Sequence, residues 1–419
     1  MKNIISTFSV ILLALAIGLS PSFTFGEITG GRPVEIRLED ILIAVFGIVL
    51  IARIFIFKVK KTEKPPLLIP ILLWLGVGVL SILTNLIFSS LPLSRAFFYF
   101  LKEIEFFFLY FYVFYGAKKP KVILNVWIFL ALANIIYVIY QIVSGVRKGE
   151  YGTAAIGEWG VLPTGAFFSL IFIFLFNVFL YYFSKLNISF PKKALLGVLC
   201  FSPIIGAFGS ISQTVVIGVL MAFVLSIFFY AIKSKDIKKF FIIICVFVVI
   251  SVIFLYFAVK NISYFRRLYS ISSFEKIIKE FIRKRWDNVI KPYFINFIKN
   301  SSLKDFIIGK GKGFVHEAHN QFLRNLMETG LVGSIAFLIL IIAILKVSFF
   351  AFLERTDNLS VGLSAGLLIA TLTMLFFSMA TEAFIVVKPS EVYWFFAGLT
   401  MSTLVFIKNN ENKRIITTK

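Results

Sequence analysis

Stretches of about 20 apolar residues recur along nearly the whole chain, and they constrain its fold more than any other feature. A helix needs about 20 largely apolar residues to cross the hydrocarbon core of a bilayer. Runs of this kind cover the approximate ranges 4–24, 41–57, 67–89, 96–115, 122–143, 161–183, 194–209, 213–232, 240–259, 331–350, 361–380 and 391–407. We therefore expect an all-α, polytopic membrane protein with about 12 transmembrane helices.

The composition agrees with this expectation. Hydrophobic residues make up 59% of the chain and charged residues 15%, whereas a soluble domain carries about 25% charged residues. The net charge of +22 would suggest a nucleic-acid partner in a soluble protein, but we expect none here. The first apolar run follows Lys2 and ends near Pro21, so it is either the first membrane helix or a cleaved signal peptide.

Lysine and arginine residues in the short loops predict the orientation, because basic loops stay in the cytoplasm. One set of alternate connections is rich in bases: Lys58, Lys60, Lys61, Lys64, Lys118, Lys119, Lys121, Lys185, Lys192, Lys193, Lys233, Lys235, Lys238, Lys239, Lys408, Lys413, Arg414 and Lys419. The opposite short loops carry fewer: Arg32, Arg37, Arg95, Arg147, Lys148 and Lys388. Both termini are therefore expected in the cytoplasm.

This orientation divides the chain into three parts. Residues 1–259 hold the first nine expected helices, residues 260–330 form one large loop on the outer face, and residues 331–419 hold the last three helices and a cytoplasmic tail. Bases outnumber acids in the outer loop. Such a surface suits either a phosphate or pyrophosphate ligand or the anionic headgroups of lipids.

Within the outer loop, residues 272–291 have the pattern of an amphipathic helix. Apolar residues recur at steps of three and four, which places them on one face, and Pro292 stands where such a helix would end or kink. We expect this helix to lie along the membrane surface with its apolar side down. Arg283 and Arg285 would then lie within reach of a phosphate at the interface.

Two further features follow in the outer loop. Glycines alternate in the segment 308–314, which predicts either a tight turn or a loop whose N–H groups cradle an anion. The chain's only two histidines come next, His316 and His319. Histidine titrates near neutral pH, so it is a natural general base for an incoming hydroxyl group, although a structural hydrogen bond is the other role open to it.

The two cysteines, Cys200 and Cys245, both lie in apolar runs. A disulfide or a zinc site is therefore not expected, and the sequence suggests no other metal ligand set. We expect each cysteine to pack as a small apolar residue.

The stretch that begins at His319 resembles the signature of bacterial O-antigen ligases. That signature reads His-Asn, nine intervening residues, Gly, two more residues and Gly; its four fixed places are filled here by His319, Asn320, Gly330 and Gly333. The wider stretch 309–333 is similar to the core of the O-antigen ligase/polymerase superfamily. Members of that superfamily have about a dozen helices and one large periplasmic loop before the last three, which agrees with the topology predicted above.

The resemblance implies glycosyl transfer at the periplasmic face of the bacterial inner membrane, in lipopolysaccharide biosynthesis. The donor would be a glycan on undecaprenyl pyrophosphate, and the acceptor a sugar hydroxyl of lipid A–core. No metal and no cofactor would be needed. His319 would activate the acceptor, Asn320 would help to bind substrate, and Arg283 or Arg285 would hold the pyrophosphate.

One position departs from the family pattern. Many members carry Ser-Arg near the start of a mid-chain helix, where this chain reads Ser212-Gln213. Gln213 can donate a hydrogen bond to a substrate but cannot neutralise a phosphate charge. Arg95, Arg147 and Lys148, all predicted on the outer side, are the candidates to replace the missing arginine.

Three other functions remain open. A polymerase would add repeat units to a lipid-linked chain with the same donor and a similar site, and a protein O-glycosylating enzyme would use another acceptor. A flippase for lipid-linked glycans is the rival outside catalysis, although such transporters tend to show internal repeats and charges near the middle of the membrane. A flippase has no need of a base at His319.

Overall fold

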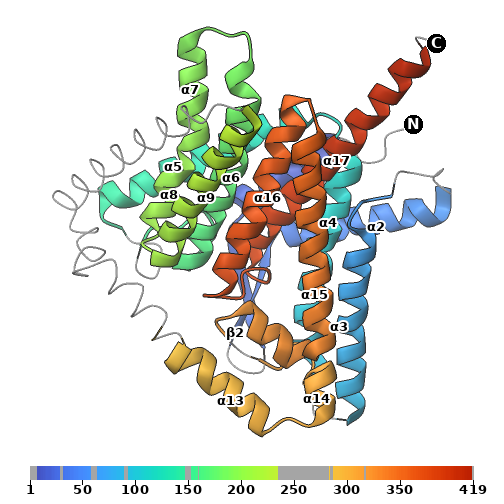
Figure 1. Cartoon of the computed structure of the whole chain (residues 1–419). Coiled ribbons are helices and arrows are strands. Elements are labelled where there is room, and N and C mark those ends of the chain that lie inside the picture. The colour runs from blue at the N-terminus through green and yellow to red at the C-terminus, as the bar shows by residue number, and fades with distance from the viewer. Residues whose placement is uncertain are drawn as a thin grey trace.

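The structure is a computed structural model that describes residues 7–28, 32–57, 64–88, 93–146, 152–158, 160–234, 283, 286–315 and 318–417 (Figure 1). Helices dominate it, as predicted. The helices up to residue 144 are α1 (Thr7–Leu19), α2 (Leu38–Phe57), α3 (Leu68–Phe88), α4 (Leu93–Gly116) and α5 (Pro120–Ser144). They are followed by α6 (Val161–Tyr181), the short η1 (Phe183–Lys185), α7 (Phe190–Phe201), α8 (Pro203–Gly209) and α9 (Gln213–Ser234). The last part contains η2 (Trp286–Ile290), α13 (Lys291–Lys299), α14 (Leu303–Ile308), α15 (Gln321–Glu354), α16 (Asn358–Ser378) and α17 (Val387–Thr417).

Helices α6 and α16 form the centre of the bundle. They pack against each other, and nearly all their side chains are buried. Helices α17, α9 and α8 also pack on α6, and α15 packs on α16. A helix that is apolar all round can face either the core or lipid, and the more hydrophobic α9 and α15 are less buried than these two central helices.

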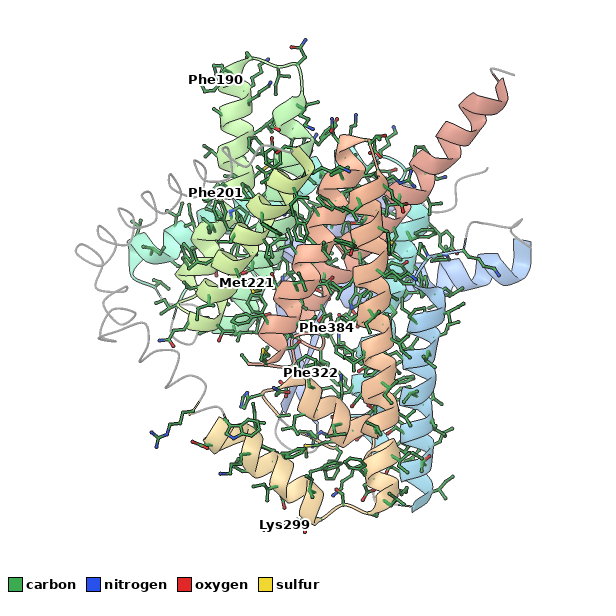
Figure 2. All side chains as sticks on the ribbon, in the orientation of Figure 1. Phe190, Phe201, Met221, Lys299, Phe322 and Phe384 are labelled. Atoms are coloured by element: carbon green, nitrogen blue, oxygen red, sulfur yellow. The ribbon has the colours of Figure 1, made fainter. Side chains whose placement is uncertain are left out.

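The outer helices direct apolar side chains away from the bundle. Ile87 on α3, Val143 on α5 and Val198 on α7 are all well exposed. Figure 2 shows such side chains projecting along the outer helices. A large apolar surface of this kind is stable in lipid and not in water, which supports a multi-pass membrane protein.

The count of spanning helices differs from the expected twelve. Among the described residues, seven helices are long and apolar enough to cross a membrane. They are Leu68–Ile87, Pro120–Ser144, Val161–Lys185, Phe190–Gly209, Gln213–Ser234, Gln321–Glu354 and Asn358–Ser378.

Several expected helices are not among these seven. Helix α1 is described over 13 residues only, fewer than the roughly 20 that a span requires, and the residues before Thr7 lie outside the described part of the chain. Helix α4 carries Lys102, Glu103 and Glu105, and α17 carries Lys388 and Glu391, so both are less apolar than a simple span. The expected span 240–259 lies outside the described residues.

An N-terminal β-hairpin was not predicted. Its strands β1 (Ser22–Ile28) and β2 (Arg32–Arg37) pair antiparallel, so the apolar run expected over 4–24 ends as a helix at Leu19. Pro21 follows that helix, and a proline cannot continue the backbone hydrogen bonding of a helix. Phe and Thr residues then favour the extended strand.

The expected amphipathic helix 272–291 falls mostly outside the described residues. From Trp286 onward the structure is described, and the π-helical turn η2 leads directly into α13. Pro292 lies in the first turn of α13. Proline is tolerated there because the first N–H groups of a helix have no intrahelical partner. The helix therefore does not end at Pro292, and the change from a π-helical to an α-helical segment lies directly before it. Helices α13 and α14 lie at one end of the bundle, beside the start of α15 (Figure 1).

Candidate functional site

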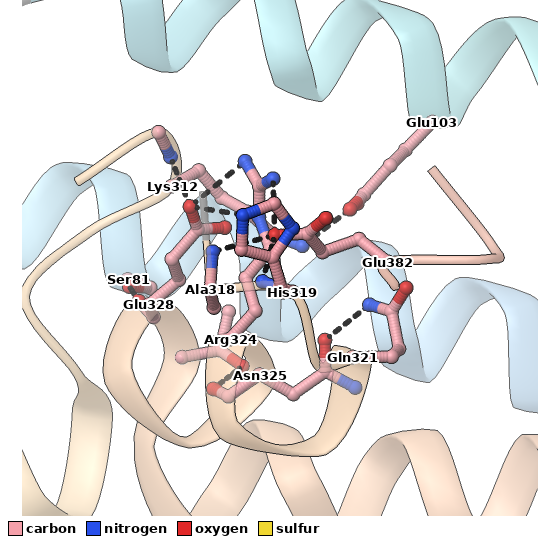
Figure 3. A network of polar contacts seen from close by, with 12 residues as sticks. Ser81, Glu103, Lys312, Ala318, His319, Gln321, Arg324, Asn325, Glu328 and Glu382 are labelled. Atoms are coloured by element: carbon pink, nitrogen blue, oxygen red, sulfur yellow. Dashed lines mark hydrogen bonds and ion pairs between the residues drawn. The ribbon is translucent and has the colours of Figure 1, made fainter. Parts of the chain in front are cut away.

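His319 lies between the glycine-rich segment and the first residue of α15. Its backbone is left-handed, with a φ of 48°, and its side chain is exposed. The Oε1 atom of Glu382 accepts hydrogen bonds from the N–H groups of Ala318 at 2.6 Å and of His319 at 3.1 Å (Figure 3). A non-glycine residue with positive φ is strained by about 1–2 kcal/mol, so these bonds hold a conformation that the chain alone does not favour.

The other three motif positions have backbone roles. Asn320 caps α15, because its Oδ1 atom accepts a hydrogen bond from the N–H of Leu323 at 2.9 Å. Gly330 forms a sharp kink inside α15, with a φ of 67°, and a Cβ atom there would lie 2.3 Å from the carbonyl oxygen of Ile307. A Cβ atom on Gly333 would lie 1.9 Å from the Oγ1 atom of Thr329. These residues shape the segment after His319.

Glu382 lies in the turn after α16 and belongs to a buried ionic network. Arg324 on α15 forms ion pairs with Glu328 at 3.1 Å and with Glu382 at 3.9 Å. Its guanidinium group also stacks on the ring of Tyr99, 4.6 Å from the ring centroid. The arginine and both carboxylates are buried, and buried charges are stable only when they are paired and hydrogen-bonded. The network therefore fixes Glu382, which in turn fixes the backbone of His319.

The glycine-rich segment forms a turn that packs on α15. Gly309, Gly311 and Gly313 all have positive φ. The N–H groups of Lys310 and Gly311 donate to carbonyl oxygens at the kink of α15, and the N–H of Gly313 donates to Glu328 at 3.1 Å. These N–H groups are engaged within the protein, so the arrangement is that of a tight turn and not of an anion cradle.

A second buried ion pair lies beside this turn. The Nζ atom of Lys312 lies 2.5 Å from Oε1 of Glu103 on α4 and 4.3 Å from the centroid of the Trp74 ring. Both charged side chains are buried. Glu103 would be costly within a membrane helix if unpaired, and this lysine from the loop removes that cost. The pair also fastens the glycine-rich turn to α4.

Arg95 is the predicted substrate-binding arginine that the structure brings to this region. It lies in the first turn of α4, and a Cβ atom placed on Gly313 of the glycine-rich turn would lie 3.1 Å from the Cγ atom of Arg95. Its Nη2 atom is buried and has no hydrogen-bond partner among the described residues. Among the predicted arginines in the described residues, Arg95 is therefore the one that lies at this turn with an N–H group not used in a hydrogen bond.

The remaining predicted residues lie elsewhere. The side chain of Arg283 is 84% exposed, and among the described residues it pairs with Asp287 at 3.8 Å. Gln213 begins α9, and no described contact joins it to the network around Glu382. Arg285 and Arg147 lie outside the described residues, as does Lys148.

A small, partly enclosed cavity lies beside Glu103 and Gln321. Gln321 and Glu103 contribute polar groups to it, and the rest of its wall is mainly aromatic and aliphatic: Trp74, Phe106, Phe107, Phe337, Leu340, Ile341, Phe384, Ile385 and Trp394. Figure 2 shows Phe384 near Phe322 at this point, and the ring of Phe337 packs against both.

No protein-family model and no curated protein matches this chain. The function therefore has to be argued from the site itself. The site combines an exposed imidazole on a fixed backbone, a buried ionic network beneath it and a nearby arginine with an unused donor.

Sequence reasoning missed the residues that hold the site together. Glu382 is separated from His319 by 63 positions, and no local pattern connects the two. Glu103 did carry a signal, since an acid within an apolar helix has to be paired or face a cavity. Arg324 and Glu328 have the spacing of a helical ion pair, which indicates a pair but not its burial.

Proposed function

We propose that this protein is a glycosyltransferase of the O-antigen ligase type. It transfers a glycan from undecaprenyl pyrophosphate to a sugar hydroxyl of lipid A–core. The observation that carries the proposal is the setting of His319: the imidazole is exposed while its backbone is held in a strained conformation by Glu382. Strain of this kind persists where the surroundings over-determine it, which is frequent at active sites.

In this reaction His319 acts as the general base. Its neutral imidazole takes the proton from the acceptor hydroxyl as the oxygen attacks the anomeric carbon of the donor sugar. The bond from that carbon to the pyrophosphate oxygen breaks, and undecaprenyl pyrophosphate leaves with the bonding electrons. A positioned base of this kind contributes about 10²- to 10⁴-fold to the rate.

Arg95 is the group that we assign to the leaving pyrophosphate. Arg324 is a poor candidate because Glu328 and Glu382 already neutralise its charge. Arg95 has a free Nη2 donor beside the glycine-rich turn, and a guanidinium group offers fixed donors to phosphate oxygens.

We place the site at the periplasmic face of the bacterial inner membrane, with both termini in the cytoplasm. The support is the alternation of basic and base-poor loops along the sequence. The site residues lie in or next to the long segment between α9 and α15, together with the turn after α16. In this proposal the exposed imidazole faces the side where lipid-linked glycans are presented.

A polymerase is the second candidate, because it would use the same donor and the same base. The match of all four motif positions favours the ligase. A flippase is disfavoured because an exposed, rigidly held histidine has no role in moving a glycan across the bilayer.

The test is a reconstituted transfer assay with lipid-linked glycan, in the presence and absence of lipid A–core, with products separated by size. His319→Asn is the decisive variant, since asparagine adopts positive φ more readily than other non-glycine residues but cannot act as the base. We expect wild-type protein to form a glycan–lipid A conjugate and His319→Asn to form at least about 100-fold less, at an unchanged unfolding temperature.

The matched control is His316→Ala, which removes the chain's other histidine and should retain transfer. Longer lipid-linked chains, made without any need for lipid A–core, would show a polymerase instead. Wild-type rates in the folded His319→Asn protein would reject a base at this position and return the flippase to consideration.

A further inference from the structure

Three carboxylates from three different helices meet inside the bundle. Asp40 comes from the first turn of α2, Glu105 from α4 and Glu391 from α17. One oxygen of each lies within 4.8 Å of an oxygen of each of the others. Residues this far apart in sequence meet only because the three helices pack together there.

A single lysine lies within this group. The Nζ atom of Lys102 lies 2.7 Å from Asp40 and 3.0 Å from Glu105. When all three carboxylates are ionised, they leave two negative charges beyond the one that the ammonium group offsets, and an excess of buried charge is costly unless it is compensated. The cluster is therefore incomplete as an ion-pair network.

Glu391 is the carboxylate whose charge has no hydrogen-bond donor beside it within the described part of the chain. Its side chain is fully buried, and neither of its carboxylate oxygens has a hydrogen-bond partner among the described residues. The Oε1 atom of Glu105 also lacks one. A buried carboxylate normally accepts several hydrogen bonds, so these oxygens are available to a ligand that is absent from the chain itself.

Nearby cationic side chains are engaged elsewhere. The Nζ atom of Lys388 donates to the carbonyl oxygens of Ile17 at 3.0 Å and Ile156 at 2.8 Å, and Arg37 pairs with Glu158 at 3.7 Å. Glu39, which accepts a hydrogen bond from Ser20, adds a further negative charge that acts on Glu391. The charges of Arg37 and Lys388 act on Glu391 with the opposite sign, but no described residue donates a hydrogen bond to its carboxylate oxygens.

We propose that Asp40, Glu105 and Glu391 bind one divalent cation of the Ca²⁺ type. Hard divalent cations take carboxylate oxygens as ligands, with Ca²⁺–O distances of about 2.4 Å. Two ligands on opposite sides of one Ca²⁺ therefore lie at most about 4.8 Å apart, which is the limit that the three oxygens satisfy. The two charges of the cation offset the two that Lys102 leaves.

The cation has a structural role in this proposal. It joins α17 to α2 and α4, and it takes no part in the transfer reaction. Glu382, which precedes α17, and Glu103 on α4 both belong to the candidate site, so the cation fixes two of the elements that carry it. The sequence had suggested no metal, because the three ligands are distributed over 352 positions, from residue 40 to residue 391.

The experiment uses the full-length protein, purified in detergent, treated with EDTA and exchanged into metal-free buffer at pH 7. Ca²⁺ is titrated while bound metal is counted by equilibrium dialysis and unfolding is followed by tryptophan fluorescence. We expect one Ca²⁺ per chain and an unfolding temperature that rises and saturates with binding. Mg²⁺ should bind more weakly, because it demands a smaller octahedral site.

Variants assign the binding to this cluster. Glu391→Gln should weaken Ca²⁺ binding at least about 10-fold, as losses in a metal site commonly do. Lys102→Met keeps all three ligands and removes the competing charge, so it should strengthen binding. Glu354→Gln removes an exposed carboxylate from the end of α15 and should leave binding unchanged.

The results that would overturn the proposal are equally definite. Wild-type protein that binds neither Ca²⁺ nor Mg²⁺ saturably would refute it, whatever the variants do. Binding that survives in Glu391→Gln, or that weakens in Lys102→Met, would place the ion elsewhere. If Glu391→Gln does not fold, Glu105→Gln replaces it with the same expectation. None of these measurements depends on glycosyl transfer, so the proposal stands or fails separately from the proposed enzyme.

Discussion

The carboxylate of Glu382 fixes the backbone of His319, from which it is separated by 63 positions in the sequence. Its Oε1 atom accepts the N–H of His319 at 3.1 Å and also that of Ala318 at 2.6 Å. The position of the proposed base therefore depends on an acid in the turn after α16, outside the motif. This dependence leads to the first of four predictions.

Replacing Glu382 should impair turnover more than donor binding. Glu382→Ala removes the acceptor that holds residues 318 and 319, and it deprives Arg324 of one of its two acids. We expect kcat to fall about 10- to 100-fold, since about 1–3 kcal/mol is lost when a buried polar group loses its partner. Steady-state kinetics with varied donor concentration would measure this split between kcat and KM.

Glu382→Gln is the matched control, because the amide oxygen can still accept both N–H groups. It should keep more activity than Glu382→Ala. Equal loss in the two variants would mean that the charge, and not the hydrogen-bond acceptor, is what His319 requires.

Arg324 should be essential for stability. Arg324→Met leaves Glu328 and Glu382 buried without their cation, and breaking a buried pair from one side costs about 3–5 kcal/mol. The free energy of unfolding in mixed detergent micelles would show this loss. Adding Glu328→Gln to Arg324→Met should recover part of it, because one of the two unpaired charges is then removed.

Arg283→Met provides the contrast. Its side chain is 84% exposed and pairs only weakly with Asp287, so we expect a change within about 0.5 kcal/mol. A similar loss in both variants would refute a stabilising role specific to the buried network.

Arg95 should set the affinity for the donor. Arg95→Ala removes the free Nη2 donor beside the glycine-rich turn, and hydrogen bonds to charged groups contribute about 1.5–3 kcal/mol. We expect the apparent donor KM to rise about 10- to 100-fold, which follows from that range. Arg95→Lys keeps the charge but loses the planar fork, so it should fall between wild type and Arg95→Ala.

The double variant Arg283→Ala/Arg285→Ala tests the role that the sequence resemblance assigned to those two arginines. If it raises donor KM more than Arg95→Ala does, the pyrophosphate is held by the segment before α13 and not by α4.

Gly330 should tolerate no side chain. A Cβ atom there would lie 2.3 Å from the carbonyl oxygen of Ile307, and the φ of 67° disfavours any L residue. Gly330→Ala should therefore destabilise the protein by more than the roughly 1 kcal/mol that a strained substitution costs at minimum. The yield of folded protein and its unfolding temperature would both fall.

Gly76→Ala is the matched substitution. A Cβ atom at Gly76, in the middle of α3, meets nothing within 4 Å, and alanine is the better helix former by about 1 kcal/mol. We expect this variant to be at least as stable as wild type. Equal damage at both glycines would contradict the backbone role of Gly330.

The apolar helices could be predicted from sequence because hydropathy is a local property. The runs at 122–143, 213–232 and 361–380 correspond to α5 (Pro120–Ser144), α9 (Gln213–Ser234) and α16 (Asn358–Ser378). Each boundary falls within a few residues of the expected one. The hairpin of β1 and β2 was missed because its two short strands depend on each other, and only their pairing distinguishes them from loops.

The motif could be predicted only in part. The sequence singled out His319, Asn320, Gly330 and Gly333, but it could not show that the glycines form a kink and a close approach or that His319 has positive φ. It also proposed Arg283 and Gln213, which no described contact joins to the network around Glu382. Charge and spacing identify candidate residues, whereas their use depends on distances between elements.

The sequence by itself determined that this protein is a helical membrane protein and that its distinctive polar motif follows a glycine-rich turn. Both properties depend only on residues that are close together in the sequence. The tertiary structure decided that Glu382 holds His319, that Lys312 neutralises Glu103, and that Asp40, Glu105 and Glu391 converge. Buried charges stabilise a fold only with partners nearby, and here helix packing alone brings partners together from distant parts of the chain.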